Sequence, residues 1–272
     1  MTQQPLMTDS TALARHRARI KADALFLQET AADEIEDRMA MVNKPFKSIA
    51  LVTGFPEFWS ARFPKAVMIA DTDTLSVEPQ THDLVIHAMS LHWANDPVGQ
   101  LIQCRRALKP DGLFLSVAFG GETLTELRAC LGQAESEVTG GLSPRVAPMA
   151  DLRDMGGLLQ RAGFALPVAD QISQTVEYGD AYALMRDLRA MGENNALAGR
   201  LRKPTRRAVL HRAATLYRDA FSTAAGRISA TFELTFLAGW APSDSQPKPL
   251  RPGSAQSRLA DALNAHETKL PD

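Results

Sequence analysis

The sequence is poor in cysteine, in net charge and in long apolar runs, and each shortage excludes a class of protein. The 272 residues include only two cysteines, Cys104 and Cys130, and no close spacing of cysteines and histidines suggests structural zinc. Two reduced thiols in a cytosolic protein are the simplest interpretation. The net charge is −1, from 30 basic and 31 acidic residues, which argues against a broad nucleic-acid-binding surface.

Signals for membranes, secretion and metals are also scarce. No apolar run reaches membrane-spanning length, and the N-terminus lacks the apolar core of a secretory signal. A basic stretch lies between Asp9 and Asp23, where a solvated helix is favoured over a cleaved targeting peptide. His82, His87 and His92 are spaced by five, and with a strand over 82–91 they would not form one cluster. We therefore expect a cytoplasmic protein with no integral membrane segment, no nucleic-acid partner and no metal.

What the sequence does contain is an alternation of short apolar runs and helical patterns. Continuous apolar runs indicate strands that are buried on both faces, as in a parallel sheet. The first four runs cover 48–53, 66–71, 82–91 and 112–119. Asp96 and Pro97 mark the start of a helix, and 229–242 alternates like a further strand. The pattern predicts an α/β fold with a doubly wound, mostly parallel sheet.

The remaining segments give a predicted organisation along the chain. It comprises a helical segment (1–45), an α/β domain (46–242) with a helical insertion at about 180–225, and a polar tail (243–272). The first segment is predicted to form one helix over 11–42, capped by Ser10 or Thr11. A basic cluster lies near its start, at Arg15, Arg17, Arg19 and Lys21. An exposed helix face is favoured for this cluster, and the alternative is a lid or partner contact near an anionic site.

Residues 81–128, THDLVIHAMSLHWANDPVGQLIQCRRALKPDGLFLSVAFGGETLTELR, resemble the class I S-adenosylmethionine-dependent methyltransferases. SLHWAND, FGGETLTELR and MGENN are similar to the branch that contains the biotin-pathway malonyl-carrier methyltransferase. They are most similar to complex I assembly factors, which are associated with hydroxylating an arginine of a complex I subunit. The resemblance runs from about residue 13 to about 255. It implies a Rossmann-like, methyltransferase-like domain over 46–242, S-adenosylmethionine as cofactor, and a complex I subunit or another protein as partner.

The glycine-rich loop of that family is degenerate in this chain. The family places an acidic residue before Gly-x-Gly-x-Gly, whereas Ala50 stands at the acid, and Val52 and Pro56 stand at the first and third glycines. Only Gly54 is retained. The branched side chain of Val52 hinders a ligand from approaching the backbone, and Pro56 has no N–H group to donate to it. Three functions stay open: a methyltransferase, a protein-binding assembly factor that has lost its cofactor, and an arginine hydroxylase.

The segment after Gly54 is also short. Residues 54–66 leave about the minimum length for one crossover between parallel strands. The sheet therefore either lacks a strand or uses its second strand for two roles. ADTDTLSV, from residue 70, resembles the family's later acidic motif, which lies near the adenine.

The resemblance and the strand ends together give the candidate site residues. The cofactor candidates are Gly54, Asp71, Thr72 and Ser90. Asp71 either binds adenine or ribose or caps a helix after its strand. The carboxyl ends of such strands are where α/β sheets bind ligands.

Two catalytic and three substrate-binding candidates follow in the chain. His92 is assigned as a polar anchor or acid/base, with a satisfied structural group as the alternative. Trp93 serves either as core or as a stacking platform. Glu122 is predicted in the first turn of a helix over 122–135. Arg128, the second catalytic candidate, and Arg145 either clamp a carboxylate or form surface salt bridges.

Overall fold

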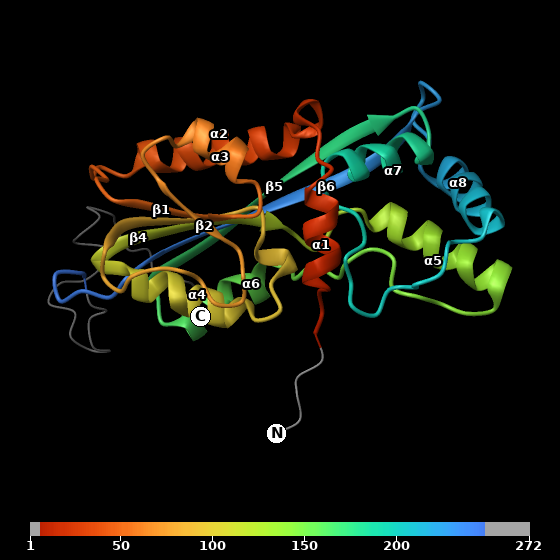
Figure 1. The fold of residues 1–272 in the computed structure, drawn as a ribbon. Helices are drawn as coiled ribbons and strands as arrows, with labels where there is room; N and C mark the ends of the chain where they lie inside the picture. The colour runs from red at the N-terminus through yellow and green to blue at the C-terminus, as the bar shows by residue number, and fades with distance from the viewer. Residues whose placement is uncertain (1–5, 248–272) are drawn as a thin grey trace, which may run out of the picture. The chain divides into compact units, whose positions relative to one another are not determined.

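The computed structural model describes residues 6–247, and its contacts divide the chain after Pro242 into two units. The first unit contains a six-stranded sheet with the order β2-β1-β3-β4-β6-β5 (Figure 1). The strands are β1 (Ile49–Thr53), β2 (Val67–Ala70), β3 (His82–Ala88), β4 (Leu108–Phe119), β5 (Ala165–Tyr178) and β6 (Ile228–Trp240). Strands β1 to β4 pair in parallel, and β6 runs antiparallel to both β4 and β5. The predicted α/β class and mostly parallel sheet are confirmed.

The crossover between β1 and β2 is as short as the sequence predicts. The helix α3 (Pro56–Arg62) is the one element between the two strands. Within the described residues, β2 is the outermost strand on its side of the sheet. Asp71 follows directly after β2. The sheet therefore has one strand beyond β1, and the acidic motif at Asp71 follows that strand.

Helices cover both faces of the parallel part of the sheet (Figure 1). One layer is α2 (Phe26–Met41) with α3, and the other is α4 (Pro97–Ala107) with α6 (Leu152–Ala162). Leu51 of β1 belongs to the core under the first layer, whereas Ala50 and Val52 belong to the core under the second. Because every residue of such a strand meets one core or the other, the strand reads as a continuous apolar run.

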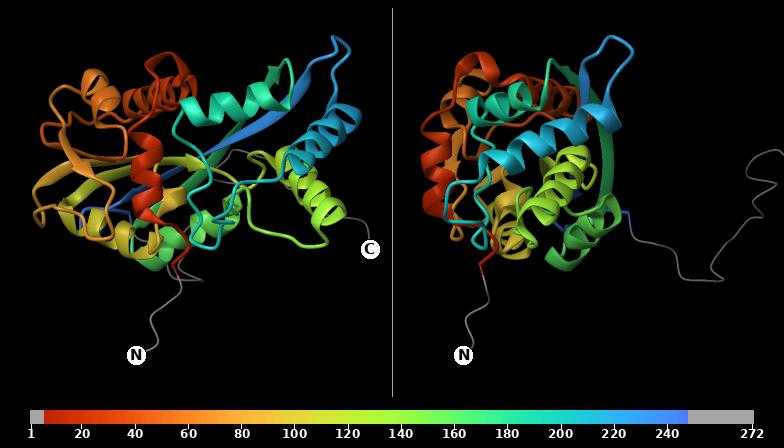
Figure 2. Two further views of the ribbon diagram at one scale, coloured as in Figure 1. Left: turned by 45° about the vertical axis from the view of Figure 1, so that its right-hand side comes forward. Right: turned by 90° about the vertical axis from the view of Figure 1, so that its right-hand side faces the viewer.

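The β5–β6 pair extends beyond the parallel strands and carries a further group of helices (Figures 1 and 2). These are α5 (Thr125–Thr139), α7 (Ala181–Ala190) and α8 (Arg207–Phe221). The predicted insertion at 180–225 thus contains two helices, which a non-helical segment separates. Tyr217 of α8 is fully buried, and its hydroxyl donates to the Ser229 carbonyl over 2.9 Å. In the part of the chain that the structure describes, no helix has the length and apolarity to cross a membrane.

Three predictions about these helices are wrong. The single helix expected over 11–42 is broken into α1 (Ser10–Arg17), a short 3₁₀ turn and α2. Asp9 caps α1 instead of Ser10 or Thr11, because its carboxylate accepts the Ala12 N–H over 3.0 Å. The helix expected from residue 122 begins only at Thr125, so Glu122 lies in the turn before α5.

The break after α1 lets this helix leave the direction of α2 and dock elsewhere. The Thr8 N–H donates to Asn95 Oδ1 over 2.8 Å, and the Asp9 N–H donates to the Ala196 carbonyl over 2.8 Å. Arg200 forms an ion pair of 2.9 Å with Asp9. These contacts fix α1 against the loops at the carboxyl ends of the strands.

Candidate functional site

Three candidate cofactor residues lie at the carboxyl ends of parallel strands. Two of them, Gly54 and Asp71, contact the same side chain. Gly54 follows β1, Asp71 follows β2, and Ser90 follows β3 by one residue. The carboxyl edge of the sheet therefore gathers them, as expected for strands that run in parallel. The side chain that joins Gly54 and Asp71 is Arg17, the last residue of α1.

The Arg17 guanidinium lies directly on the backbone of Gly54. A Cβ atom built on Gly54 would be 2.0 Å from Arg17 Nη1, so a larger residue here would displace the guanidinium from this position. Nη1 donates to Asp71 Oδ2 over 2.6 Å, and the guanidinium carbon lies 5.2 Å from the centre of the Phe55 ring. No helix follows β2, so the helix-cap alternative for Asp71 is wrong, and its carboxylate binds Arg17 instead.

The residues at the degenerate loop positions belong to the sheet and to the first turn of α3. Ala50 and Val52 are fully buried inside the sheet. Pro56 is the first residue of α3, where a missing N–H costs no intrahelical hydrogen bond. Phe55 and Trp59 are buried beside it. Phe55 and Trp59 therefore anchor the turn after β1 in the core, whereas Gly54, Pro56 and Phe58 line a cavity of about 730 Å³.

Thr72 and Ser90 use their hydroxyl groups locally. Thr72 is exposed, and its hydroxyl donates to the Thr74 carbonyl over 2.7 Å. Ser90 is buried, and its hydroxyl donates to the Ala88 carbonyl over 3.2 Å. Met89 between them is fully buried and has a left-handed backbone with φ 48°. Such a conformation costs about 1–3 kcal/mol and is concentrated at functional sites.

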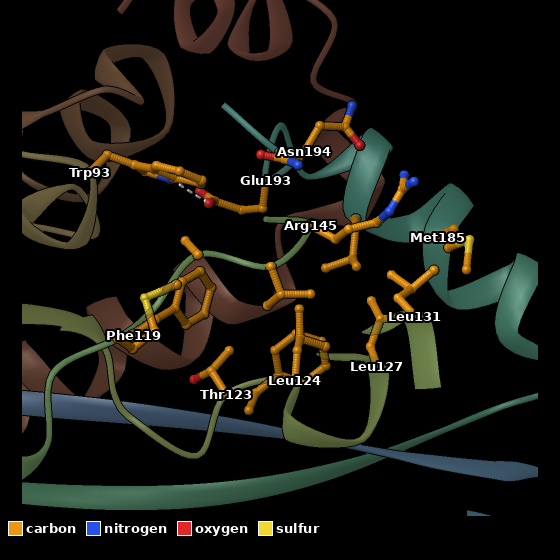
Figure 3. Close-up of a pocket in the computed structure, with 16 residues that line it drawn as sticks. Trp93, Phe119, Thr123, Leu124, Leu127, Leu131, Arg145, Met185, Glu193 and Asn194 are labelled. Carbon is orange, nitrogen blue, oxygen red and sulfur yellow. Dashed lines mark hydrogen bonds between the residues drawn. The ribbon is translucent and has the colours of Figure 1, made fainter. Parts of the chain in front are cut away.

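A separate cavity of about 140 Å³ lies beyond β4, beside Trp93 and Phe119 (Figure 3). Its walls come from the segments after β3 and β4, from α5 and α7, and from the loop after α7. Leu124, at the base, has a second left-handed backbone with φ 57°. The structure therefore places Trp93 at a cavity wall, next to Glu193 in the loop after α7.

Glu193 organises the polar side of this cavity. Its Oε2 accepts the Trp93 indole N–H over 2.7 Å and lies 3.4 Å from His92 Nε2. His92 Nδ1 in turn accepts the Phe119 N–H over 3.4 Å. Both ring nitrogens of His92 are therefore engaged, so its role as an acid/base stays a prediction.

Glu193 is an ionised carboxylate although it is buried. Burial by itself raises the pKa of a carboxyl group, because it disfavours the charged form. The hydrogen bond and electrostatic interaction with His92, the charge of Arg17 and the Trp93 hydrogen bond act in the opposite direction. Their sum lowers the pKa of Glu193 below its ordinary value.

The three remaining candidates lie around α5. Arg145 lines the cavity, but its guanidinium clamps Glu135, with Nη2 2.6 Å from Oε1 and Nε 3.1 Å from Oε2. Arg128 donates to the Ala147 carbonyl over 3.2 Å and so holds a wall of the cavity. Glu122 is exposed. Their assignment to catalysis or substrate binding stays a prediction.

The sequence pattern did not single out Arg17 or Glu193. Arg17 belongs to the basic cluster for which an exposed face was favoured, and the alternative of a contact near an anionic site fits it better. Glu193 lies in the MGENN motif, which carries the resemblance but suggests no chemistry. Within residues 6–247, no group of histidine, cysteine and acidic residues is arranged to hold a metal ion.

Comparison with known proteins defines first the class and then the family. A family model described as "Methyltransferase domain" matches residues 44–116. The Danio rerio protein named "Arginine-hydroxylase NDUFAF5, mitochondrial" is 34% identical, over 92% of this chain and 71% of that protein. The Homo sapiens protein of the same name is 40% identical, over 71% of this chain and 55% of that protein. The chain therefore belongs to the NDUFAF5 family of methyltransferase-like proteins.

A second group of relatives carries a different name. The "Malonyl-[acyl-carrier protein] O-methyltransferase" of Laribacter hongkongensis is 36% identical, over 67% of this chain and 59% of that protein. The chain thus covers less than two thirds of this relative and of the human NDUFAF5 protein. Both branches expected from the sequence motifs are present among the relatives.

The residues around Gly54 lack several features that the family's cofactor loop uses to hold S-adenosylmethionine. A ligand that approaches this glycine needs the space in which the Arg17 guanidinium lies. The Asp71 carboxylate, a candidate for the adenine or ribose, is paired with Arg17. Ala50 supplies no carboxylate and is buried. Arg17 thus holds the position directly on Gly54, and a cavity of about 730 Å³ adjoins Arg17, Gly54 and Phe58.

Proposed function

We propose that this protein is a respiratory complex I assembly factor that binds a complex I subunit through a methyltransferase fold without S-adenosylmethionine. The observation that carries the proposal is the position of Arg17 between Gly54 and Asp71. Membership of the NDUFAF5 family supports the biological role, and the open cavity beside Trp93 offers a place for part of a partner.

Affinity purification of the tagged protein from its native cells tests the partner. We expect a complex I subunit to be enriched over a tag-only control, and complex I assembly to fall in a deletion strain. Normal assembly together with no enriched subunit would contradict the proposal.

The cofactor is tested separately by calorimetric titration of S-adenosylmethionine into the purified protein. We expect no saturable binding up to millimolar concentration, because hydrogen bonds to charged groups are worth about 1.5–3 kcal/mol each and several are absent. Micromolar binding would instead favour an S-adenosylmethionine-dependent methyltransferase, which the match to the methyltransferase model supports.

Hydroxylation of an arginine in the bound subunit is the second candidate function. The names of the curated relatives favour it. Mass spectrometry of that subunit from wild-type and deletion strains decides between binding alone and modification. An arginine that carries oxygen only in the wild type would add this activity to the assembly role.

The location of the protein belongs to the same proposal. The cytoplasmic location expected from the sequence stays a prediction, whereas the NDUFAF5 relatives are named as mitochondrial. Fractionation of native cells with antibodies against the protein measures where it acts.

A further inference from the structure

The cavity of about 730 Å³ beside Gly54 is lined by the end of α1, the 3₁₀ turn after it and the start of α3. Its volume is in the usual range of small-ligand sites, about 300–1,000 Å³. Apart from Arg17 and Glu57, its walls consist of glycine and of residues with apolar side chains, such as Ile20 and Phe58. Glu57 is exposed to solvent. The cavity therefore combines apolar walls with one buried charge, because the Arg17 side chain is only 10% exposed.

Arg17 has two hydrogen-bond donors without an acceptor. Its Nη1 donates to Asp71 Oδ2 over 2.6 Å. Its Nε and Nη2 are buried and have no hydrogen-bond partner within residues 6–247. Buried polar groups are nearly always hydrogen-bonded, and a buried donor without an acceptor costs free energy. These two atoms therefore mark a position where an acceptor from another molecule is favourable.

The two free donors lie on the same edge of the guanidinium group. The Nε–H and Nη2–H bonds of this edge point in parallel, which is the fork geometry that binds both oxygens of one carboxylate. A carbonyl or hydroxyl oxygen would leave one of the two donors without an acceptor. The flanking residues Arg15, Arg19 and Lys21 are exposed and add positive charge at this end of α1. Both the geometry and the charge therefore suit a carboxylate.

We propose that this cavity binds a free carboxylic acid with an apolar body, whose two oxygens accept the Nε and Nη2 hydrogens of Arg17. A phosphate group presents three acceptor oxygens, more than this edge satisfies. Apart from Arg17 and the exposed Glu57, the side chains of the walls offer nothing for a nucleoside to hydrogen-bond. The apolar body of the acid lies against Ile20 and Phe58. This ligand site goes beyond the assembly role and does not depend on it.

Calorimetric titration of octanoate into the full chain is the direct test. The probe 1-octanol has the same chain without the charge, butyrate has the carboxylate on a short chain, and inorganic phosphate has no apolar body. We expect saturable binding of one octanoate per chain. Each methylene group between butyrate and octanoate should strengthen binding about fourfold, because it buries further apolar surface. Octanol should bind about tenfold more weakly or less, since it loses the charged hydrogen bonds, and phosphate should not bind.

Two variants test the two parts of the site. Arg17→Lys keeps a positive charge beside Asp71 and loses the parallel N–H pair, so we expect octanoate binding to weaken about tenfold or more. Arg15→Lys, the same change at an exposed residue of α1, should leave binding unchanged. Ala18→Phe fills part of the cavity from an exposed position and leaves Arg17 in place, and it should also weaken binding. Thermal unfolding identifies a variant that misfolds, and the probe series on the wild type then decides.

The outcomes separate this inference from the proposed function. Equal binding of octanoate and octanol, unchanged octanoate binding by a folded Arg17→Lys, or no saturable octanoate binding by the wild type would overturn the inference. S-adenosylmethionine that displaces octanoate at micromolar concentration would assign the cavity to the cofactor and overturn it too. Octanoate binding that depends on Arg17 would support the acid site even if no complex I subunit is enriched. An enriched subunit without octanoate binding would support the assembly role alone.

Discussion

Arg17 shows how much one side chain decides in this fold. By sequence it is one of four basic residues in a short stretch, and its neighbours Arg15 and Arg19 are exposed. Arg17 instead reaches a position that a glycine leaves open and pairs with the carboxylate of Asp71. Arg17 thereby occupies the position on Gly54 that the usual ligand of a methyltransferase fold approaches.

The Arg17–Asp71 pair should also contribute to stability. Its side chains are 10% and 15% exposed, so solvent screens the pair only in part. We expect Arg17→Ala to lower the free energy of unfolding by about 1.5–3 kcal/mol, the value of a hydrogen bond to a charged group. Urea unfolding measures this difference. Arg15→Ala is the control, and an equal loss in both variants would contradict a special role for Arg17.

Glu135 provides a pH-dependent prediction at the same scale. The Arg145 hydrogen bond, against the opposing effect of burial, lowers the pKa of Glu135 from 4.5 to about 2. Because the folded-state pKa is depressed, the stability contributed by Glu135 is present above pH 4.5 and is lost as the pH falls toward about 2. Glu135→Gln should therefore be less stable than wild type at pH 7 by about 1.5–3 kcal/mol.

Urea unfolding of both proteins at several pH values measures this difference. It should shrink across the acid range and nearly vanish at the lowest pH, because the protonated wild type resembles the glutamine variant. A difference that stays constant down to pH 2 would mean that the charge of Glu135 is not its source.

At the scale of elements, the packing of β1 explains why the loop lacks the family's acidic residue. Ala50 and Val52 face the core under α4, whereas Leu51 faces the core under α2. The family's acidic residue would therefore stand inside an apolar core. The turn after β1 continues the same packing through Phe55 and α3.

Restoring the family's acidic residue in β1 should lower the free energy of unfolding. Ala50→Asp places a carboxylate at a residue with no exposed surface, and an uncompensated buried charge costs about 3–5 kcal/mol. We expect chemical unfolding to show this loss at neutral pH and a smaller loss in acid, where the group is neutral. Ser173→Asp on the exposed strand β5 should change stability by about 0.5 kcal/mol or less. A soluble Ala50→Asp protein of normal stability would show that β1 has room for the family's acid.

At the scale of the whole molecule, stability is distributed unevenly across the sheet. Strands β1, β3 and β4 are paired on both sides and almost wholly buried. Strand β5 pairs with β6 alone among the described strands, and only Tyr178 of its residues is buried. The ribbon that carries α7 and α8 therefore has one weakly protected edge.

Hydrogen exchange followed by mass spectrometry should report this order. We expect amides of β3 and β4 to exchange last, with protection close to global unfolding, and those of β5 to exchange earlier through local opening. The amides of β2, at the opposite edge of the sheet, should exchange about as early as those of β5. Equal protection of β5 and β3 would mean that another molecule or copy covers the β5 edge in solution.

The sequence by itself determined the strands, the start of α4, the short crossover after β1 and the family, because each is encoded in neighbouring residues. Apolar runs report burial on both faces, and motifs such as SLHW and FGGETL survive as local strings. Only the tertiary structure decided the site. Arg17 and Asp71 are 54 residues apart, and Trp93 and Glu193 are 100 apart. The break between α1 and α2 and the path of the loop after α7 bring these side chains together, and no local periodicity records such long-range contacts.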